Sequence, residues 1–301
     1  MRLLASMVAS GALFCASPSA QAPGADLRTR LTQDTAALAQ ASDHDPVAQR
    51  LLAEITDAQH QGGMEREAYE AARALGDWAF ANSQWDIARP AWAAAAALTS
   101  APLARGQALY AEGAAIVVHD TRGARPHLTD QDAETAMRAF DQAKMTLAQV
   151  AFSTQPSATL TPEQVAFAQA AAWDGIVRVK FADARRKLPP GYREDRLNFG
   201  PIDDNRPPCP VSLDHDPMPN YPSDALSEFG VAEVILWIDF DQGGLSSNIR
   251  VAAGVGGDAF IEAMRRVVGQ WHATANLSAN CQLLSPRLER IDFRQRYFED
   301  Q

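Results

Sequence analysis

Apolar residues recur every three and four positions between residues 25 and 186, which is the period of an α-helix. The pattern predicts helices over 26–41, 46–60, 64–82, 85–99, 102–119, 130–151 and 161–186. Proline stands in the first turn of three of them, at Pro46, Pro102 and Pro162, where its missing N–H removes no helical hydrogen bond. Residues 23–190 are therefore predicted to form an all-helical domain.

One predicted helical hairpin has residues at the spacings of a tetratricopeptide repeat, namely Leu75, Gly76, Trp85, Ala88, Trp92 and Ala95. The small Gly76 and Ala88 suit a close crossing of two helices, and the two tryptophans would fill the groove beside them. A similar signature recurs at Ala136, Phe140 and Ala143. The domain thus resembles an irregular tetratricopeptide array, a class that often binds peptides in a concave groove. Any tightly packed helical bundle gives the same pattern, so both interpretations stand.

The periodicity changes after a segment rich in Pro, Asp and Asn, which predicts a linker over 191–208 and a second domain over 209–296. Strands are expected at 231–240, 245–252 and 287–296, with a helix at 258–270. Gly243 and Gly244 allow a tight hairpin between the first two strands. One face of the first strand would hold Val234, Leu236, Ile238 and Phe240, and the other Ile235, Trp237 and Asp239. The whole chain is expected to be of the α+β class.

The landmarks of the second domain are Tyr221, Pro222, Ala225, Val234, Asp239, Gly244, Phe260 and Trp271. Their order and spacing resemble the C-terminal domain of TonB-family energy transducers, over Pro219 to about Phe293. The chain departs from the family at Ala232, where Gly is usual, and at Ala273 and Ala275, where an aromatic residue and Pro are usual. The resemblance implies a small β-β-α-β fold in which Tyr221, Pro222, Gly244 and Trp271 have structural roles.

The resemblance also implies a function. In TonB transducers, this domain lies in the periplasm and captures a short extended segment of an outer-membrane receptor as an added strand. The expected partners are therefore envelope proteins such as outer-membrane receptors, in TonB-dependent transport or envelope assembly. Strand addition uses the unpaired N–H and C=O groups of an edge strand. The last expected strand is the candidate edge, with Arg287, Glu289, Ile291 and Phe293 as candidate partner-binding residues.

Residues 1–22 have the features of a secretory signal peptide, with Arg2 before an apolar run at Leu3–Ala16 and small residues at the expected cut. Pro23 would directly follow the cut, which is unfavourable for cleavage. We expect an exported, periplasmic protein. The alternative is an uncut segment that anchors an energy transducer in the inner membrane, although the run is shorter than the roughly 20 residues that span a bilayer. Membrane association is expected only in that case.

Cysteine usage fits export. Cleavage would remove Cys15 and leave Cys209 and Cys281. An even pair in an oxidising compartment predicts one disulfide, across a loop of about 70 residues, that would stabilise the fold by roughly 4 kcal/mol. The alternative is two buried free thiols.

The formal net charge of −10 and the pI of about 5.1 disfavour nucleic acid and anionic membranes as partners. Residues 43–46 and 214–217 both read Asp-His-Asp-Pro, but adjacent residues rarely ligate one ion together, so polar turns are expected and no metal site. Residues 254–257 lack the Lys-Ser/Thr of a phosphate loop. No nucleophile–base pair is recognisable. We therefore expect no catalytic residue and no cofactor in a protein-binding chain; an envelope enzyme is the remaining alternative.

Overall fold

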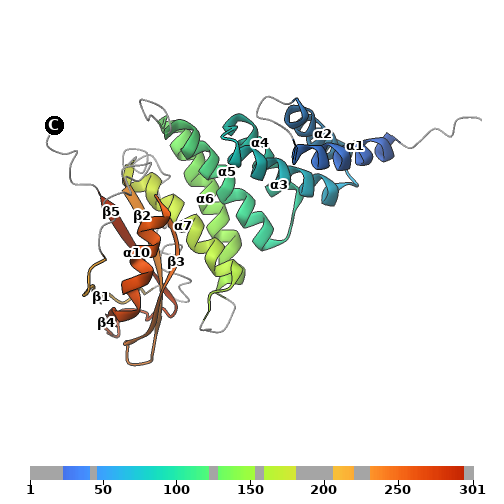
Figure 1. Cartoon of the computed structure of the whole chain (residues 1–301). Coiled ribbons are helices and arrows are strands. Elements are labelled where there is room, and N and C mark those ends of the chain that lie inside the picture. The colour runs from blue at the N-terminus through green and yellow to red at the C-terminus, as the bar shows by residue number, and fades with distance from the viewer. Residues whose placement is uncertain are drawn as a thin grey trace, which may run out of the picture.

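The computed structural model describes residues 23–40, 46–121, 128–152, 159–180, 206–219 and 231–294. Within these ranges helices come first and small antiparallel sheets follow, so the predicted α+β class is confirmed (Figure 1). The helices are α1 (Pro23–Leu38), α2 (Val47–Gln61), α3 (Glu65–Ala81), α4 (Trp85–Leu98), α5 (Pro102–Thr121), α6 (Asp130–Ala151) and α7 (Pro162–Lys180). Their bounds lie close to the predicted ones because proline and helical periodicity mark them locally.

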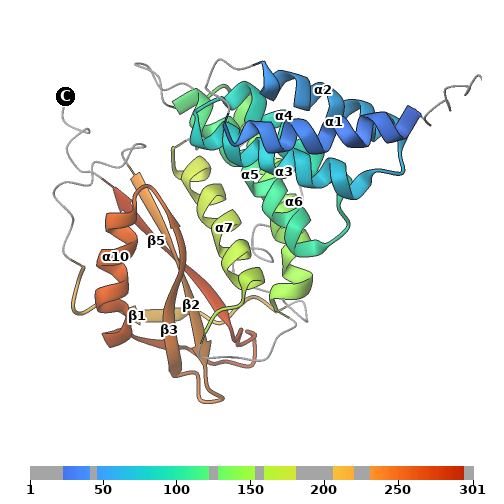
Figure 2. The same ribbon diagram turned by 45° about the vertical axis from the view of Figure 1, so that its right-hand side comes forward.

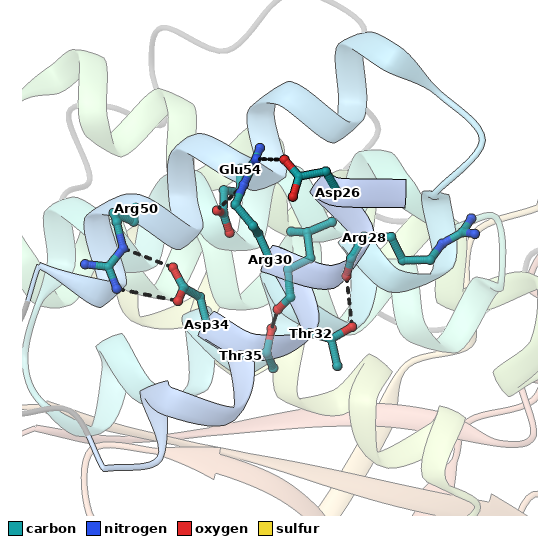
Figure 3. Close-up of polar contacts among 9 residues, drawn as sticks. Asp26, Arg28, Arg30, Thr32, Asp34, Thr35, Arg50 and Glu54 are labelled. Carbon is teal, nitrogen blue, oxygen red and sulfur yellow. Dashed lines mark hydrogen bonds and ion pairs between the residues drawn. The ribbon is translucent and has the colours of Figure 1, made fainter. Parts of the chain in front are cut away.

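The helical array begins with α1, which packs on α2 and α3. Its buried leucines face the array, and ion pairs with α2 surround them. Arg30 Nε lies 3.0 Å from Glu54 Oε1 of α2, and Arg50 Nε of α2 lies 3.1 Å from Asp34 Oδ2 (Figure 3). The arginine of each pair is about half exposed, and pairs with one solvent-exposed member contribute about 1 kcal/mol or less, so the apolar contact supplies most of the stability.

Consecutive helices pack as hairpins, and glycine allows two of these contacts to be close. A Cβ on Gly76 of α3 would lie 2.5 Å from the Trp92 ring of α4. A Cβ on Gly113 of α5 would lie 2.6 Å from the Phe140 ring of α6. Only glycine therefore fits opposite these rings. The predicted close approach at Gly76, with Trp92 beside it, is confirmed.

The main sheet has the order β3-β2-β5, with β2 (Val231–Phe240), β3 (Ser246–Val255) and β5 (Arg287–Arg294) all antiparallel. A two-stranded sheet pairs β1 (Val211–Asp214) with β4 (His272–Ala275). Between β3 and β4 lie α10 (Asp258–Val267) and a short 3₁₀ turn, Val268–Gln270. The three long strands and this helix were predicted. The pattern missed β1 and β4, because four residues are too few to establish a two-residue period.

Two helices cover opposite faces of the main sheet (Figure 2). On one face, α10 and the chain that follows it pack on the predicted set Val234, Leu236, Ile238 and Phe240. On the other face, α7 packs on Ile235 and Trp237, and the Trp237 ring stacks on Phe152 with centroids 5.2 Å apart. The helical array and the sheet therefore share one apolar core. Residues 191–205 of the predicted linker lie outside the described residues.

The predicted disulfide is confirmed. Cys209 and Cys281 are bonded, with their Cα atoms 4.8 Å apart and both side chains buried. The bridge joins the segment before β1 to the segment before β5, 72 residues further along the chain. In the part of the chain that the structure describes, no helix is both long and apolar enough to cross a membrane. The predicted signal segment, 1–22, lies outside that part.

Candidate functional site

The strand β5 lies at the edge of the main sheet. It pairs along its length with β2, and the described residues place no other strand beside it. An edge strand directs every second residue's N–H and C=O groups away from the sheet. The chemistry of this site depends on which residues those are.

The hydrogen bonds of Ser285 show which backbone groups of β2 point toward β5 and therefore which groups of β5 point outward. The register pairs Ile238 of β2 with Arg287 of β5, which places Ser285 opposite Phe240. The Ser285 hydroxyl accepts from the Phe240 N–H at 2.9 Å and donates to the Phe240 carbonyl at 3.1 Å. Phe240 thus directs both backbone groups toward the β5 side. Because this direction alternates along a strand, the β2 residues bonded to β5 are Ala232, Val234, Leu236 and Ile238, opposite Phe293, Ile291, Glu289 and Arg287.

The outward backbone groups of β5 consequently belong to Leu288, Arg290 and Asp292. The four residues singled out from the sequence alternate with these and share the α10 face of the sheet. Their backbone groups point inward, to β2. Sequence reasoning missed the outward set, because a two-residue period shows which side chains share a face but not which amides face a neighbour.

The four predicted side chains make contacts within the fold. Arg287 is buried, donates to the Cys209 carbonyl and contacts Glu289 at 2.6 Å. Ile291 and Phe293 are half-buried against the core on the α10 face. The Phe293 ring lies 5.4 Å from that of Phe260 on α10. These side chains therefore shape the surface beside the edge and hold β5 in place.

Charged residues gather on the α7 face of the same strands. Glu233 of β2 is buried, lies opposite Asp292, and contacts Arg290 Nε at 2.6 Å. Burial raises the pKa of Glu233 to about 10, and its hydrogen bond to the Asp292 carboxylate adds to the rise, against the attraction of Arg290. Two acidic groups in one hydrogen bond need a shared proton, so we expect Glu233 to keep its proton at pH 7 despite the contact with Arg290.

The cluster continues into the helical array. Asp174 of α7 is fully buried and accepts from Lys144 Nζ of α6 and from Arg178 Nε, each at 2.7 Å. Burial alone would raise the pKa of Asp174, but the two cations hold it below its ordinary value. A Cβ on the adjacent Gly175 would lie 2.6 Å from the Glu233 carboxyl carbon, so glycine allows β2 to approach α7 here. No local pattern marked this cluster, because it joins residues of α6, α7 and β2 that meet only in the folded chain.

A groove follows the helices of the array. Two adjoining cavities of about 480 and 490 Å³ share Gln107 and Tyr110 of α5. Helices α3, α5 and α7 supply most of the lining, with half-buried rings and alanines, and α4 contributes the buried Trp92. The lining includes Tyr69, Arg73, Asp77, Phe80, Trp92, Tyr110, Val165, Gln169 and Trp173. Burial raises the pKa of Tyr110, and the nearby Asp77 carboxylate raises it further. This is an open, elongated surface with aromatic walls.

The family-motif residues divide into two groups. Tyr221 and Pro222 lie outside the described residues. Gly244 has φ +80° and closes the β2–β3 hairpin, where its N–H donates to the Asp241 carbonyl at 3.0 Å. Trp271 is buried, and its indole N–H donates to the Pro217 carbonyl at 2.9 Å. Both described residues thus have structural positions.

The repeated Asp-His-Asp-Pro segments can be compared in part. Residues 43–45 lie outside the described ranges. In the second segment, the Asp216 N–H donates to Asp214 Oδ1 at 3.2 Å, and the His215 ring packs edge-on against Trp271. Among the residues that the structure describes, no group of three His, Cys, Asp or Glu side chains is placed to hold a metal ion.

No protein-family model matches the chain, and neither the curated proteins nor the solved structures contain a significant match to it.

Proposed function

We propose that the chain binds an extended segment of a partner protein by adding it as a strand to β5. The observation that supports this is the edge position of β5, with the backbone groups of Leu288, Arg290 and Asp292 pointing away from β2. Main-chain hydrogen bonds would supply affinity, and the flanking side chains would supply selectivity. The order of elements, β2-β3-α10-β5, agrees with the TonB-like interpretation of the sequence, with β4 as an addition.

On this proposal the partners are envelope proteins such as outer-membrane receptors, and the role is in TonB-dependent transport or envelope assembly. The setting is the periplasm, which suits the Cys209–Cys281 disulfide. The alternative role, a membrane-anchored transducer, differs in the fate of residues 1–22. Intact mass and fractionation of the native protein separate the two. A soluble chain that begins near Pro23 supports a binding module, and a full-length chain in the inner membrane supports a transducer.

Residue-resolved amide hydrogen exchange on the full-length, oxidised chain tests strand addition. In the free protein, the amides of Leu288, Arg290 and Asp292 should exchange faster than those of Glu289 and Ile291, which bond to β2. Ten-residue peptides from the periplasmic segments of outer-membrane receptors serve as probes. A binding peptide should slow exchange of the outward set selectively. Binding without any change in that set would contradict the proposal.

The groove supports a second candidate function, peptide recognition by the helical array. The supporting observation is its elongated shape and the half-buried rings of Tyr110 and Trp173 along it. Replacing Tyr110 with alanine should weaken a groove-bound peptide and leave exchange at β5 unchanged. Phe293→Ala should instead weaken a peptide bound at β5 and leave the affinity of a groove-bound peptide unchanged. A peptide whose affinity responds to neither change binds elsewhere.

A further inference from the structure

The side chains of β5 offer two different surfaces to a strand added beside it. Residues paired across two strands have their side chains on the same face. On the α10 face, the added strand would meet Glu289, Ile291 and Phe293. On the α7 face, it would meet Leu288, Arg290 and Asp292. Successive residues of the partner strand would therefore contact the two sets of side chains in turn.

The α10 face is apolar at two of its positions. Ile291 and Phe293 are half-buried, so each has apolar surface that the present fold leaves in contact with water. The buried ring of Phe260 on α10 lies next to Phe293 and supports it from below. Apolar partner residues opposite these two positions would remove that surface from water, whereas charged ones would lose hydration.

The α7 face is charged at the intervening positions. Arg290 is fixed from behind by Glu233, at 2.6 Å, and 26% of its side chain is exposed. Asp292 is exposed at the next position on this face. Charges of opposite sign directly across two strands attract, and like charges destabilise the pair. An acidic partner residue suits Arg290, and a basic one suits Asp292.

We propose that β5 selects an extended segment in which apolar residues face Ile291 and Phe293, while an acidic residue faces Arg290 and a basic residue faces Asp292. This inference rests on the proposed strand addition. We propose further that the added strand runs antiparallel to β5, as every strand pair of this sheet does. Read from its N-terminus, the selected segment is apolar, basic, apolar, acidic.

Three synthetic peptides with blocked termini test this order. The first carries the core Val-Lys-Val-Glu between threonines. The second reverses the charges, Val-Glu-Val-Lys, and the third shifts the phase to Lys-Val-Glu-Val. Affinity is measured by fluorescence anisotropy on the full-length chain, and exchange at Leu288, Arg290 and Asp292 locates the bound peptide. The first peptide should bind about tenfold more tightly than either of the others, because two cross-strand charge pairs change sign or two apolar pairs are lost.

A charge variant makes the test specific. Asp292→Lys should reduce the preference for the first peptide over the charge-reversed one by about threefold or more. Asp57→Lys, on an exposed position of α2, makes the same change in net charge and should leave the preference unaltered.

The outcomes separate the two proposals. Equal affinities, together with protection of the outward amides, would overturn the selection rule and leave strand addition intact. Tighter binding of the second or third peptide, with the same protection, would also overturn the rule alone. If none of the three peptides binds with protection of these amides, strand addition at β5 and the rule that rests on it both fail.

Discussion

The carboxyl group of Glu233 gives the sharpest prediction about the shared core. Its pKa of about 10 lies far above its ordinary value of 4.5, chiefly because of burial. The folded state therefore binds this proton more tightly than the unfolded state does. The contribution of Glu233 to stability is therefore fully present below pH 4.5 and is lost as the pH rises from there toward 10. Glu233→Gln keeps the shape and the hydrogen-bonding capacity of a neutral carboxyl, and does not titrate.

The expected magnitude follows from the interval between the unfolded-state pKa and the working pH. From pH 4.5 to pH 7, the Glu233 carboxyl lowers the free energy of unfolding of the wild-type chain by about 1.4 kcal/mol per pH unit, or about 3 kcal/mol in all. The glutamine amide of the Glu233→Gln variant does not titrate, so this variant does not undergo the same loss of stability. The advantage of Glu233→Gln in free energy of unfolding should therefore be small at pH 5 and grow to about 3 kcal/mol at pH 7.

Urea denaturation of the full-length, oxidised chain at pH 5, 6, 7 and 8 measures this difference. Tryptophan fluorescence is a suitable signal, because Trp237 lies in the same buried core. Glu262→Gln, on an exposed position of α10, is the matched control because it makes the same substitution outside the buried core. Each variant is compared with wild type at the same pH, so the pH dependence of stability that both chains share cancels.

The opposite result would refute the argument. If Glu233→Gln is less stable than wild type at pH 7, with a difference that does not grow with pH, then Glu233 is ionised and paired with Arg290. Removing one member of a buried pair costs about 3–5 kcal/mol, so this outcome differs from the expected one in sign.

Three further predictions concern the buried contacts. Lys144→Met leaves the carboxylates around it without their ammonium partner and should lower the free energy of unfolding by about 3–5 kcal/mol, measured in urea at pH 7; a neutral effect would mean that water replaces the ammonium. Reduction of the Cys209–Cys281 disulfide should cost about 4 kcal/mol, seen as a lower urea midpoint with dithiothreitol, and an unchanged midpoint would contradict the loop-closure reasoning. Gly76→Ala should cost about 1–3 kcal/mol by displacing the facing tryptophan ring, whereas Gly269→Ala, which meets no atom within 4 Å, should cost less; equal thermal shifts would count against the close helix crossing.

Local patterns in the chain were sufficient to predict the individual helices and long strands. Helical periodicity and prolines such as Pro102 and Pro162 located the helices, since these signals act within a few residues of the place they mark. The long strands followed from β-branched and aromatic runs, and the faces of β2 followed from their two-residue period. Cysteine number, together with the expected export and loss of Cys15, predicted the disulfide. All of these are properties of neighbouring residues or of composition.

How these elements meet depends on the packing of the folded chain. The cluster around Asp174 and Glu233 joins residues from α6, α7, β2 and β5, and its charges are tolerable only because packing brings opposite charges together. The outward amides of β5 are likewise set by its register against β2, not by its own pattern. Register depends on which faces become buried when the sheet packs between α7 and α10, and no local signal in the chain contains that information.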